Sequence, residues 1–336
     1  MGFDTKNCSD EDFIEFCYRQ ILRRPPDESG MEHFISCLGS DAWTREDLLI
    51  HFLHSEEFNT QVVSQEVVPS GHFYSVVPSM EDRKEFLAKE PSDEVLAIKL
   101  YAEEQFDLLK LFEEYYLDFP FDEQESSRFR FYLPNEAYGF TDAFFLYSMM
   151  REFEPKRVVE IGSGYSSALM LDVSEHFLGG SVEFSFVDPH PEVFHSVVKD
   201  FEDRERLIPK KLQDLGEGLF RELQDGDFLF VDSSHVSKLG SDVNKIFFQI
   251  LPMLEGGVFV HFHDIFWPFE YPKDWVRDGF AWNEAYLLRA FLQYNESFEV
   301  VLFSSFLHTA YRSWIEEHMP RYWEHPGANL WIRKNS

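Results

Sequence analysis

A glycine loop at residues 162–164 is the part of this sequence best suited to hold a small ligand. A β-branched run, Val158 to Ile161, precedes the loop, and the segment SSALMLDVSEHF, with apolar residues at helical spacing, follows it. A strand, a tight loop and a helix in this order place a ligand at the carboxyl end of the strand. Gly162 and Gly164 allow the backbone to approach that ligand closely, where a Cβ would collide. Glu160 adds a carboxylate just before the turn.

Two cofactors fit this loop. The pattern Gly162-x-Gly164-x-x-Ser167 approximates a dinucleotide-binding loop without its third glycine, and Asp188 follows at a spacing that suits either cofactor. Glu160 would repel a pyrophosphate, whereas it would stabilise a sulfonium nucleoside that carries a free amino group. The loop therefore favours S-adenosylmethionine over a nicotinamide dinucleotide, with Ser163 and Ser167 among the residues that bind it.

Polar residues also follow the later strands that the sequence predicts. They are Asp188, Gln213 with Asp214, Asp232, and His263 with Asp264. Because the carboxyl ends of parallel strands share one edge of a sheet, we expect these side chains to surround a single site. Asp188 is placed to accept hydrogen bonds from the ribose hydroxyls, and Gln213-Asp214 suits the exocyclic amine of adenine.

His235, three residues after Asp232, is the best candidate for a general base, since an imidazole titrates near neutral pH. Asp232 and Asp264 would repel each other on neighbouring strand ends unless a cation or a proton lies between them. Their oxygens favour Mg²⁺ or Mn²⁺, with His263 as a third ligand. His261 and His263 share a face of their strand, so a two-histidine iron site is an alternative. The aromatic segment Phe266–Trp275 would form a wall of the acceptor pocket.

Charge and composition exclude several classes of partner. The 336-residue chain has 30 basic and 61 acidic residues, a net charge of −31, which opposes binding to nucleic acid or to an anionic membrane surface. No apolar run is long enough to span a bilayer. The three cysteines, Cys8, Cys17 and Cys37, have no ligand spacing with any histidine, and they predict reduced thiols in a cytoplasmic protein.

The sequence predicts a small all-α domain at residues 1–65, a connector with a helical cap at 66–150, and a catalytic domain at 151–336. In the first domain, Ser9 or Asp10 and then Thr44 can cap helices, and a further helix is expected at about Met31–Leu38. In the second part, residues 96–116 have the spacing of one long amphipathic helix. Thr141 or Asp142 is expected to cap the next helix.

From residue 157 onward, predicted strands and helices alternate. The later strands are expected at 182–187, 207–208, 228–231, 258–262, 300–303 and 330–332. Helices are expected to begin near Pro191, Leu215, Ser241 and Asn283. This alternation predicts an α/β fold with a doubly wound, mostly parallel sheet, and the final two strands could add an antiparallel edge.

These motifs resemble those of the class I S-adenosylmethionine-dependent methyltransferases. The similarity is carried by Glu160-x-Gly162-x-Gly164, FVDP, DFLFVDSSH and EGGVFVHFHD, and it is closest to the branch called methyltransferase family 24. GHFYSVVPS, YGFTDAFFLYS and WNEAYLLRAFL are similar to that branch too. The resemblance implies a seven-stranded Rossmann-like sheet with a reversed final hairpin. It also implies a divalent ion held after the fourth and fifth strands, by Asp232, His263 and Asp264.

About fifty residues within the helical block at 9–60 resemble a helical domain of unknown function that occurs beside glycan-modifying enzymes. The similarity is carried by Arg23, Pro26, Asp27, Gly30, Ser55, Glu56 and Phe58. It implies an accessory domain that mediates homo-oligomer formation or binds a protein partner. The sequence thus predicts O-methylation of a hydroxyl on a small molecule or glycan. The alternatives are a nicotinamide-dependent oxidoreductase and a catalytically silent cofactor-binding protein.

Overall fold

The computed structural model of the chain describes residues 8–22, 24–40, 43–58, 68–121, 128–135, 137–198 and 200–336. It forms two compact units, Met1–Glu85 and Phe86–Ser336. The predicted boundary at residues 65 and 66 lies outside the described residues, as does Arg23. Residues 86–150, predicted as a connector and helical cap, belong to the same unit as the sheet.

The first unit is helical. Its helices are α1 (Asp10–Ile21), α2 (Glu28–Gly39) and α3 (Arg45–His54), and α4 (Met80–Leu87) crosses into the second unit. The predicted caps are confirmed, because the Ser9 side chain accepts from the Asp12 amide and Thr44 forms a capping box with Asp47. Asp27 caps α2, which therefore starts three residues earlier than the periodicity predicts. Apolar side chains from all three helices, among them Phe13, Phe34 and Phe52, form a separate core.

The second unit is built on one seven-stranded sheet in the order β3-β2-β1-β4-β5-β7-β6. Its strands are β1 (Arg157–Ile161), β2 (Glu183–Val187), β3 (Leu207–Ile208), β4 (Phe228–Val231), β5 (Phe259–His263), β6 (Phe298–Phe303) and β7 (Asn329–Lys334). The first five are parallel, and β7 runs antiparallel to both β5 and β6. The predicted fold class, including the reversed final hairpin, is confirmed.

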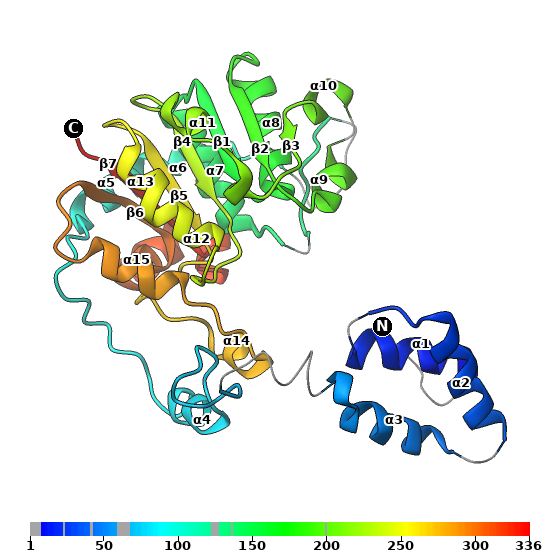
Figure 1. Cartoon of the computed structure of the whole chain (residues 1–336). Coiled ribbons are helices and arrows are strands. Elements are labelled where there is room, and N and C mark those ends of the chain that lie inside the picture. Colours follow the sequence, from blue (N-terminus) through cyan, green and yellow to red (C-terminus); the bar gives the residue numbers. More distant parts are fainter. Residues whose placement is uncertain are drawn as a thin grey trace. The chain divides into compact units, whose positions relative to one another are not determined.

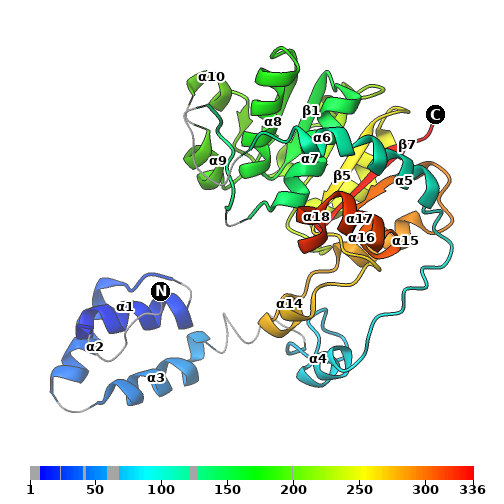
Figure 2. The same ribbon diagram turned by 180° about the vertical axis from the view of Figure 1, so that it is seen from behind.

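Helices cover both faces of this sheet. The helices that follow α4 in the chain are α5 (Ala102–Leu111), α6 (Glu113–Leu117), α7 (Phe140–Phe153), α8 (Tyr165–Phe177), α9 (Glu192–Val197), α10 (Phe201–Arg204), α11 (Gly218–Arg221), α12 (Asp242–Lys245), α13 (Leu251–Met253), α14 (Lys273–Asp278), α15 (Glu284–Leu292), α16 (Ser304–Ala310), α17 (Arg312–His318) and α18 (Pro320–Glu324). Two short segments are η2 (Leu212–Asp214), a 3₁₀ turn, and η3 (Ile246–Ile250), a π-helical turn that joins α12 to α13. Figure 1 shows α12, α13 and α15 in front of the sheet, and Figure 2 shows α5–α7 and α16–α18 on the opposite face.

Both faces of the central strands are buried, which explains their composition. Every residue of β4, Phe228 to Val231, is buried, and β1 is buried from Val158 to Ile161. A strand covered by helices on both sides needs continuous apolar residues, in contrast to the alternating pattern of a strand with one solvated face. Glu160 is the one ionisable residue of β1 inside this layer, and it lies next to the glycine loop.

Two helix predictions were wrong in their limits. Residues 96–116 do not form one helix, because Ala97 and Tyr101 have positive φ angles and the helix begins only at Ala102. A break at Phe112 then separates α5 from α6. Helix α7 is preceded by Gly139, so Thr141 and Asp142 lie in its first turn and do not cap it. Their side chains bind the backbone of residues 325–329 instead: Thr141 donates to the His325 carbonyl, and Asp142 accepts from the Ala328 amide.

Arg130 connects the segment before α7 to α8 and α10. Its guanidinium lies 2.8 Å from Asp172, 2.8 Å from Glu175 and 2.9 Å from Asp203. The Asp172 side chain is completely buried, and it also accepts from the backbone amides of Arg130 and Phe131. A buried carboxylate that loses its cation carries an uncompensated charge, which costs much more than the loss of an exposed ion pair.

No helix among the described residues has the length and apolar character needed to cross a membrane.

Replacing Arg130 by Ala leaves the buried Asp172 carboxylate without its cation. This change should lower the free energy of unfolding by about 3 kcal/mol. Arg157→Ala is the matched control, because Arg157 pairs with Glu183 at an exposed position, and this change should cost less than about 1 kcal/mol. Urea denaturation of the three proteins measures the difference. Equal destabilisation by the two variants would contradict the role given to Arg130.

Candidate active site

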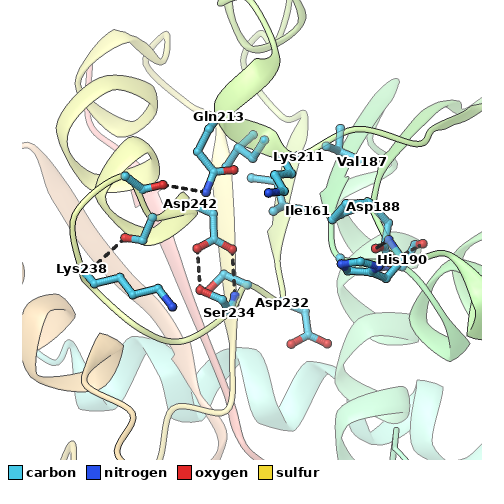
Figure 3. Close-up of a pocket in the computed structure, with 17 residues that line it drawn as sticks. Ile161, Val187, Asp188, His190, Lys211, Gln213, Asp232, Ser234, Lys238 and Asp242 are labelled. Atoms are coloured by element: carbon cyan, nitrogen blue, oxygen red, sulfur yellow. Dashed lines mark hydrogen bonds between the residues drawn. The ribbon is translucent and has the colours of Figure 1, made fainter. Parts of the chain in front are cut away.

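A cavity of about 660 Å³ opens at the carboxyl ends of β1, β2 and β4. Its lining includes five residues predicted for the site, which are Gly162, Ser163, Asp188, Gln213 and Asp232. In Figure 3, Asp188 and His190 lie on one side of the cavity, Lys238 and Asp242 lie on the other, and Asp232 lies between them. This volume falls within the range of sites that enclose a small organic ligand or cofactor.

Gly162 holds the loop and the β4 end together. Its φ of +82° is a conformation that side chains rarely adopt, and a Cβ on it would lie 2.1 Å from the Asp232 carbonyl oxygen. The Gly162 amide donates to the Val187 carbonyl at the end of β2. The glycine is thus required by close packing between three strand ends as well as by the approach of a ligand.

Glu160 does not line the cavity, in contrast to its predicted contact with the cofactor. It is fully buried and accepts hydrogen bonds from both Ser166 and Ser167. Ser167 in turn accepts from the Gly164 amide at 3.0 Å. Burial raises the pKa of Glu160 to about 8, although both hydroxyl bonds favour the ionised form. Glu160, Gly164 and Ser167 therefore act by fixing the loop from behind.

Asp188 lines the cavity as predicted and has one oxygen turned to the glycine loop. Its Oδ2 accepts from the Ser163 amide at 2.9 Å and from the Ser163 hydroxyl at 3.0 Å. Its Oδ1 accepts from the His190 amide. The carboxylate is partly exposed, so it can also accept from ligand hydroxyls.

At the far end of the cavity, the structure separates two neighbours that were predicted together. Gln213 lines the cavity, whereas Asp214 is exposed and does not. Lys245, which is buried, donates to the Leu215 carbonyl at 2.5 Å and fixes this turn. Lys211 and Lys238 line the cavity too, and sequence reasoning missed both.

The residues predicted to carry the chemistry lie together at the carboxyl ends of β4 and β5. They are Asp232, His235 and Asp264. His235 Nε2 lies 3.3 Å from Asp232 Oδ1 and 3.5 Å from Asp264 Oδ2. These three side chains form the one group among the described residues whose geometry could hold a metal ion, with their ligand atoms within 4.8 Å of one another. His263 was predicted in place of His235 in this set. Its Nδ1 lies 3.4 Å from Asp264 and 3.9 Å from Asp232, so it faces the same carboxylates from the interior.

Glu284, at the start of α15, was not predicted as a site residue. It is fully buried, and its carboxylate lies 2.9 Å from His235 Nδ1 and accepts from the Ser233 hydroxyl. The Asn283 and Glu284 amides both donate to the His235 carbonyl, so the backbone of His235 is held as well as its side chain. With these contacts in place, the φ angle of His235 is +56°. Nothing in the sequence distinguishes Glu284 from an ordinary acidic residue in the first turn of a helix.

Charge pairing controls protonation in this cluster. Burial alone would lower the pKa of His235, but the hydrogen bonds to Asp232 and Glu284 raise it to about 10. The pKa of His263 is likewise raised to about 10, against the effect of burial, by Asp264 and Asp232. Both side chains are therefore imidazolium ions at neutral pH, and their charges offset the repulsion between the carboxylates.

His261 does not join the cluster. It is buried against Phe230 and Trp331, at ring-centroid distances of 3.9 and 4.8 Å, and burial lowers its pKa well below the ordinary value. Its ring lies 5.9 Å from that of His263. His261 is not part of the metal-capable group found among the described residues, so the structure gives an iron site built on His261 and His263 no support.

Substituting Gly162 by Ala should destabilise the second unit by about 2–3 kcal/mol, because the new Cβ meets the Asp232 carbonyl and the positive φ is strained. Affinity for S-adenosylhomocysteine should fall with it. Gly218→Ala is the control, because a Cβ there meets nothing within 4 Å. Chemical denaturation and calorimetric titration measure both effects, and a Gly162→Ala protein as stable as the control would contradict them.

The protonation of His235 predicts a pH dependence of stability. Because the folded pKa of about 10 exceeds the ordinary value of 6.5, the native state keeps a proton that the unfolded chain has lost. The free energy of unfolding should therefore fall between these pH values as pH rises, by about 1.4 kcal/mol per pH unit for each retained proton. Urea denaturation from pH 7 to pH 10 measures this slope. In His235→Asn the slope should be smaller; parallel slopes would exclude an imidazolium at this position.

Two family models match parts of this chain. Residues 159–265 match the family model of a methyltransferase domain, and residues 2–62 match a domain of unknown function (DUF4214). An uncharacterized protein of Archaeoglobus fulgidus is 30% identical over 177 residues, 50% of this chain and 80% of that protein. The crystal structure of an S-adenosylhomocysteine-bound methyltransferase from Podospora anserina covers 81% of this chain and 99% of its own, with 15% identity and a TM-score of 0.38. The chain belongs to the class I S-adenosylmethionine-dependent methyltransferases and carries a DUF4214 domain before the methyltransferase domain.

Proposed function

We propose that this enzyme transfers the methyl group of S-adenosylmethionine to a hydroxyl oxygen, with His235 as the residue that takes the proton. The observation that supports this proposal is the position of His235 Nε2, within 3.5 Å of Asp232 and Asp264 at the mouth of the strand ends. An alcohol has a pKa far above 7, so it must share its proton with a base as it attacks.

In the proposed reaction the acceptor oxygen attacks the methyl carbon, the carbon–sulfur bond breaks, and S-adenosylhomocysteine leaves. The acceptor proton passes to His235 Nε2, while Glu284 accepts from Nδ1 and keeps Nε2 turned to the acceptor. His235 must first lose the proton that the carboxylates stabilise. A sulfonium cation bound beside Asp232 competes for the same negative charge and so lowers the pKa of His235. After methyl transfer, His235 releases the acceptor proton to solvent.

A divalent cation is a second possibility for this cluster, and the donor set fits one. Asp232, Asp264 and His235 Nε2 would hold it, with His263 Nδ1 near enough for a fourth bond after a small movement. Carboxylate and imidazole together suit Mn²⁺ better than Mg²⁺. A bound cation would polarise the acceptor hydroxyl and lower its pKa. His235 Nε2 cannot both ligate a cation and take a proton, so a titration separates the two roles.

The decisive experiment is calorimetric titration with S-adenosylhomocysteine, with Mn²⁺ and with EDTA, followed by methyl transfer from labelled S-adenosylmethionine to a panel of hydroxylated compounds. We expect S-adenosylhomocysteine to bind in EDTA. Binding of a nicotinamide dinucleotide in its place would support the oxidoreductase alternative. S-adenosylhomocysteine binding without transfer to any acceptor would support a silent cofactor-binding protein. Transfer that requires Mn²⁺ and stops in EDTA would indicate that His235 is a ligand of the cation and does not take the proton.

Asp232→Asn should reduce methyl transfer by roughly 10²-fold or more, because the imidazolium that forms when His235 takes the acceptor proton loses one of the two carboxylates that stabilise it at Nε2. S-adenosylhomocysteine should still bind, which shows that the variant is folded. Asp214→Asn provides the same chemical change at an exposed position outside the cavity lining and should leave transfer unchanged. Equal turnover in wild type and Asp232→Asn would remove Asp232 from the mechanism.

A cytoplasmic location and a partner-binding role for the first domain stay predictions.

A further inference from the structure

Three aromatic side chains of the segment that connects β5 to α15 lie in contact with one another. They extend from the acid-imidazole cluster, which consists of Asp232, His235 and Asp264. Trp282 lies 5.2 Å from Trp275 and 4.9 Å from Phe280, and Trp275 lies 5.9 Å from Phe280, all as ring-centroid distances. The predicted wall, Phe266–Trp275, supplies only one of these rings. Phe266 and Tyr271 pack against Trp275 from behind. We call Trp275, Phe280 and Trp282 the aromatic platform.

The platform is joined directly to the proposed base. The Trp282 ring lies 4.3 Å from the His235 ring at an angle of 31°. Because the next two amides, of Asn283 and Glu284, both donate to the His235 carbonyl, the indole is fixed relative to Nε2. A molecule that packs on Trp282 is therefore close enough to bring a hydroxyl to His235 Nε2.

The three rings leave apolar surface exposed beside the cluster. Phe280 is 46% exposed, and Trp275 and Trp282 are both only partly buried. Phe248 and Tyr294 of this unit are exposed as well, and the platform differs from them in its connection to His235 through Trp282. Contiguous apolar surface beside a reactive cluster is typical of a ligand-binding surface.

Charge and ring geometry restrict the ligand. Both cations of α14 are paired, Lys273 with Glu90 and Arg277 with Asp274, so this helix offers an anionic acceptor no ready partner. The overall charge of −31 opposes an anion as well. The rings meet edge to face, Trp282 at 79° to Trp275 and at 67° to Phe280, so they form no parallel slot for a flat ring. Such a surface presents single ring faces, which suit the C–H face of a saturated ring.

We propose that the aromatic platform binds the methyl acceptor and that this acceptor is a neutral, saturated, hydroxylated ring such as a pyranoside. The ring's C–H face packs on Trp282 and Phe280, while a hydroxyl at its edge points to His235 and Asp264. This proposal rests on the proposed function and specifies its substrate class. It also assigns the residues after α14 to the acceptor, whereas the cavity of Figure 3 holds the donor.

The test is saturation-transfer NMR on the full chain loaded with S-adenosylhomocysteine, with methyl α-glucopyranoside, methyl α-galactopyranoside and methyl α-mannopyranoside as probes and catechol as the flat-ring comparison. We expect contact with the C–H groups of at least one pyranoside. Phe280→Ala and Trp275→Ala should each weaken that contact roughly three- to tenfold, the loss of one stacking partner. Phe248→Ala, at a 64% exposed aromatic residue on η3, should not change it.

Calorimetry with S-adenosylhomocysteine on the same samples separates the two proposals. If the donor product binds and no pyranoside makes contact, or if catechol alone does, the substrate class is wrong while the methyltransferase proposal stands. Pyranoside contact that survives both platform variants would place the acceptor elsewhere. Failure of S-adenosylhomocysteine to bind would overturn the proposed function and this inference together.

Discussion

The active end of this molecule depends on a balance of charge among buried side chains. Three carboxylates, Asp232, Asp264 and Glu284, lie within 3.5 Å of the His235 ring, and His263 faces two of them. Without the imidazoles the carboxylates would repel one another, and without the carboxylates the buried imidazoles would lose their protons. Each sign of charge therefore stabilises the other. In the proposed reaction, a cationic methyl donor binds beside this cluster, and the movement of a single proton adjusts the charge of the site.

The same end of the sheet couples the donor cavity to the chemical residues. The Asp232 carbonyl lies against Gly162, and the Asp232 side chain lies between the cavity and His235. Glu160 supports the glycine loop from inside the sheet, and Glu284 supports His235 from α15. The glycine loop and His235 are thus each fixed by a buried carboxylate, and in the proposed reaction this would restrict the geometry of transfer.

Much of the fold and part of the site could be predicted from the sequence, because they follow from local order. Continuous apolar runs that end in polar residues, with helical spacing between them, determine a parallel sheet covered on both faces. The same order brings Gly162, Asp188 and Asp232 to one edge whatever the packing details are. The helix limits at residues 96–116 could not be read in this way, because apolar spacing continues through positions whose backbone is not helical.

Tertiary structure decided the roles of the individual side chains. Glu160 turns toward Ser166 and Ser167 inside the sheet layer, and Gln213 lines the cavity where its neighbour Asp214 does not. His235 takes the position between two carboxylates because α15 holds it there through Glu284, a contact between residues 49 positions apart. The sequence alone determined which residue types reach the edge of the sheet, since strand order is local. Only the packed structure determined which of them face each other, because side-chain direction depends on contacts between distant segments.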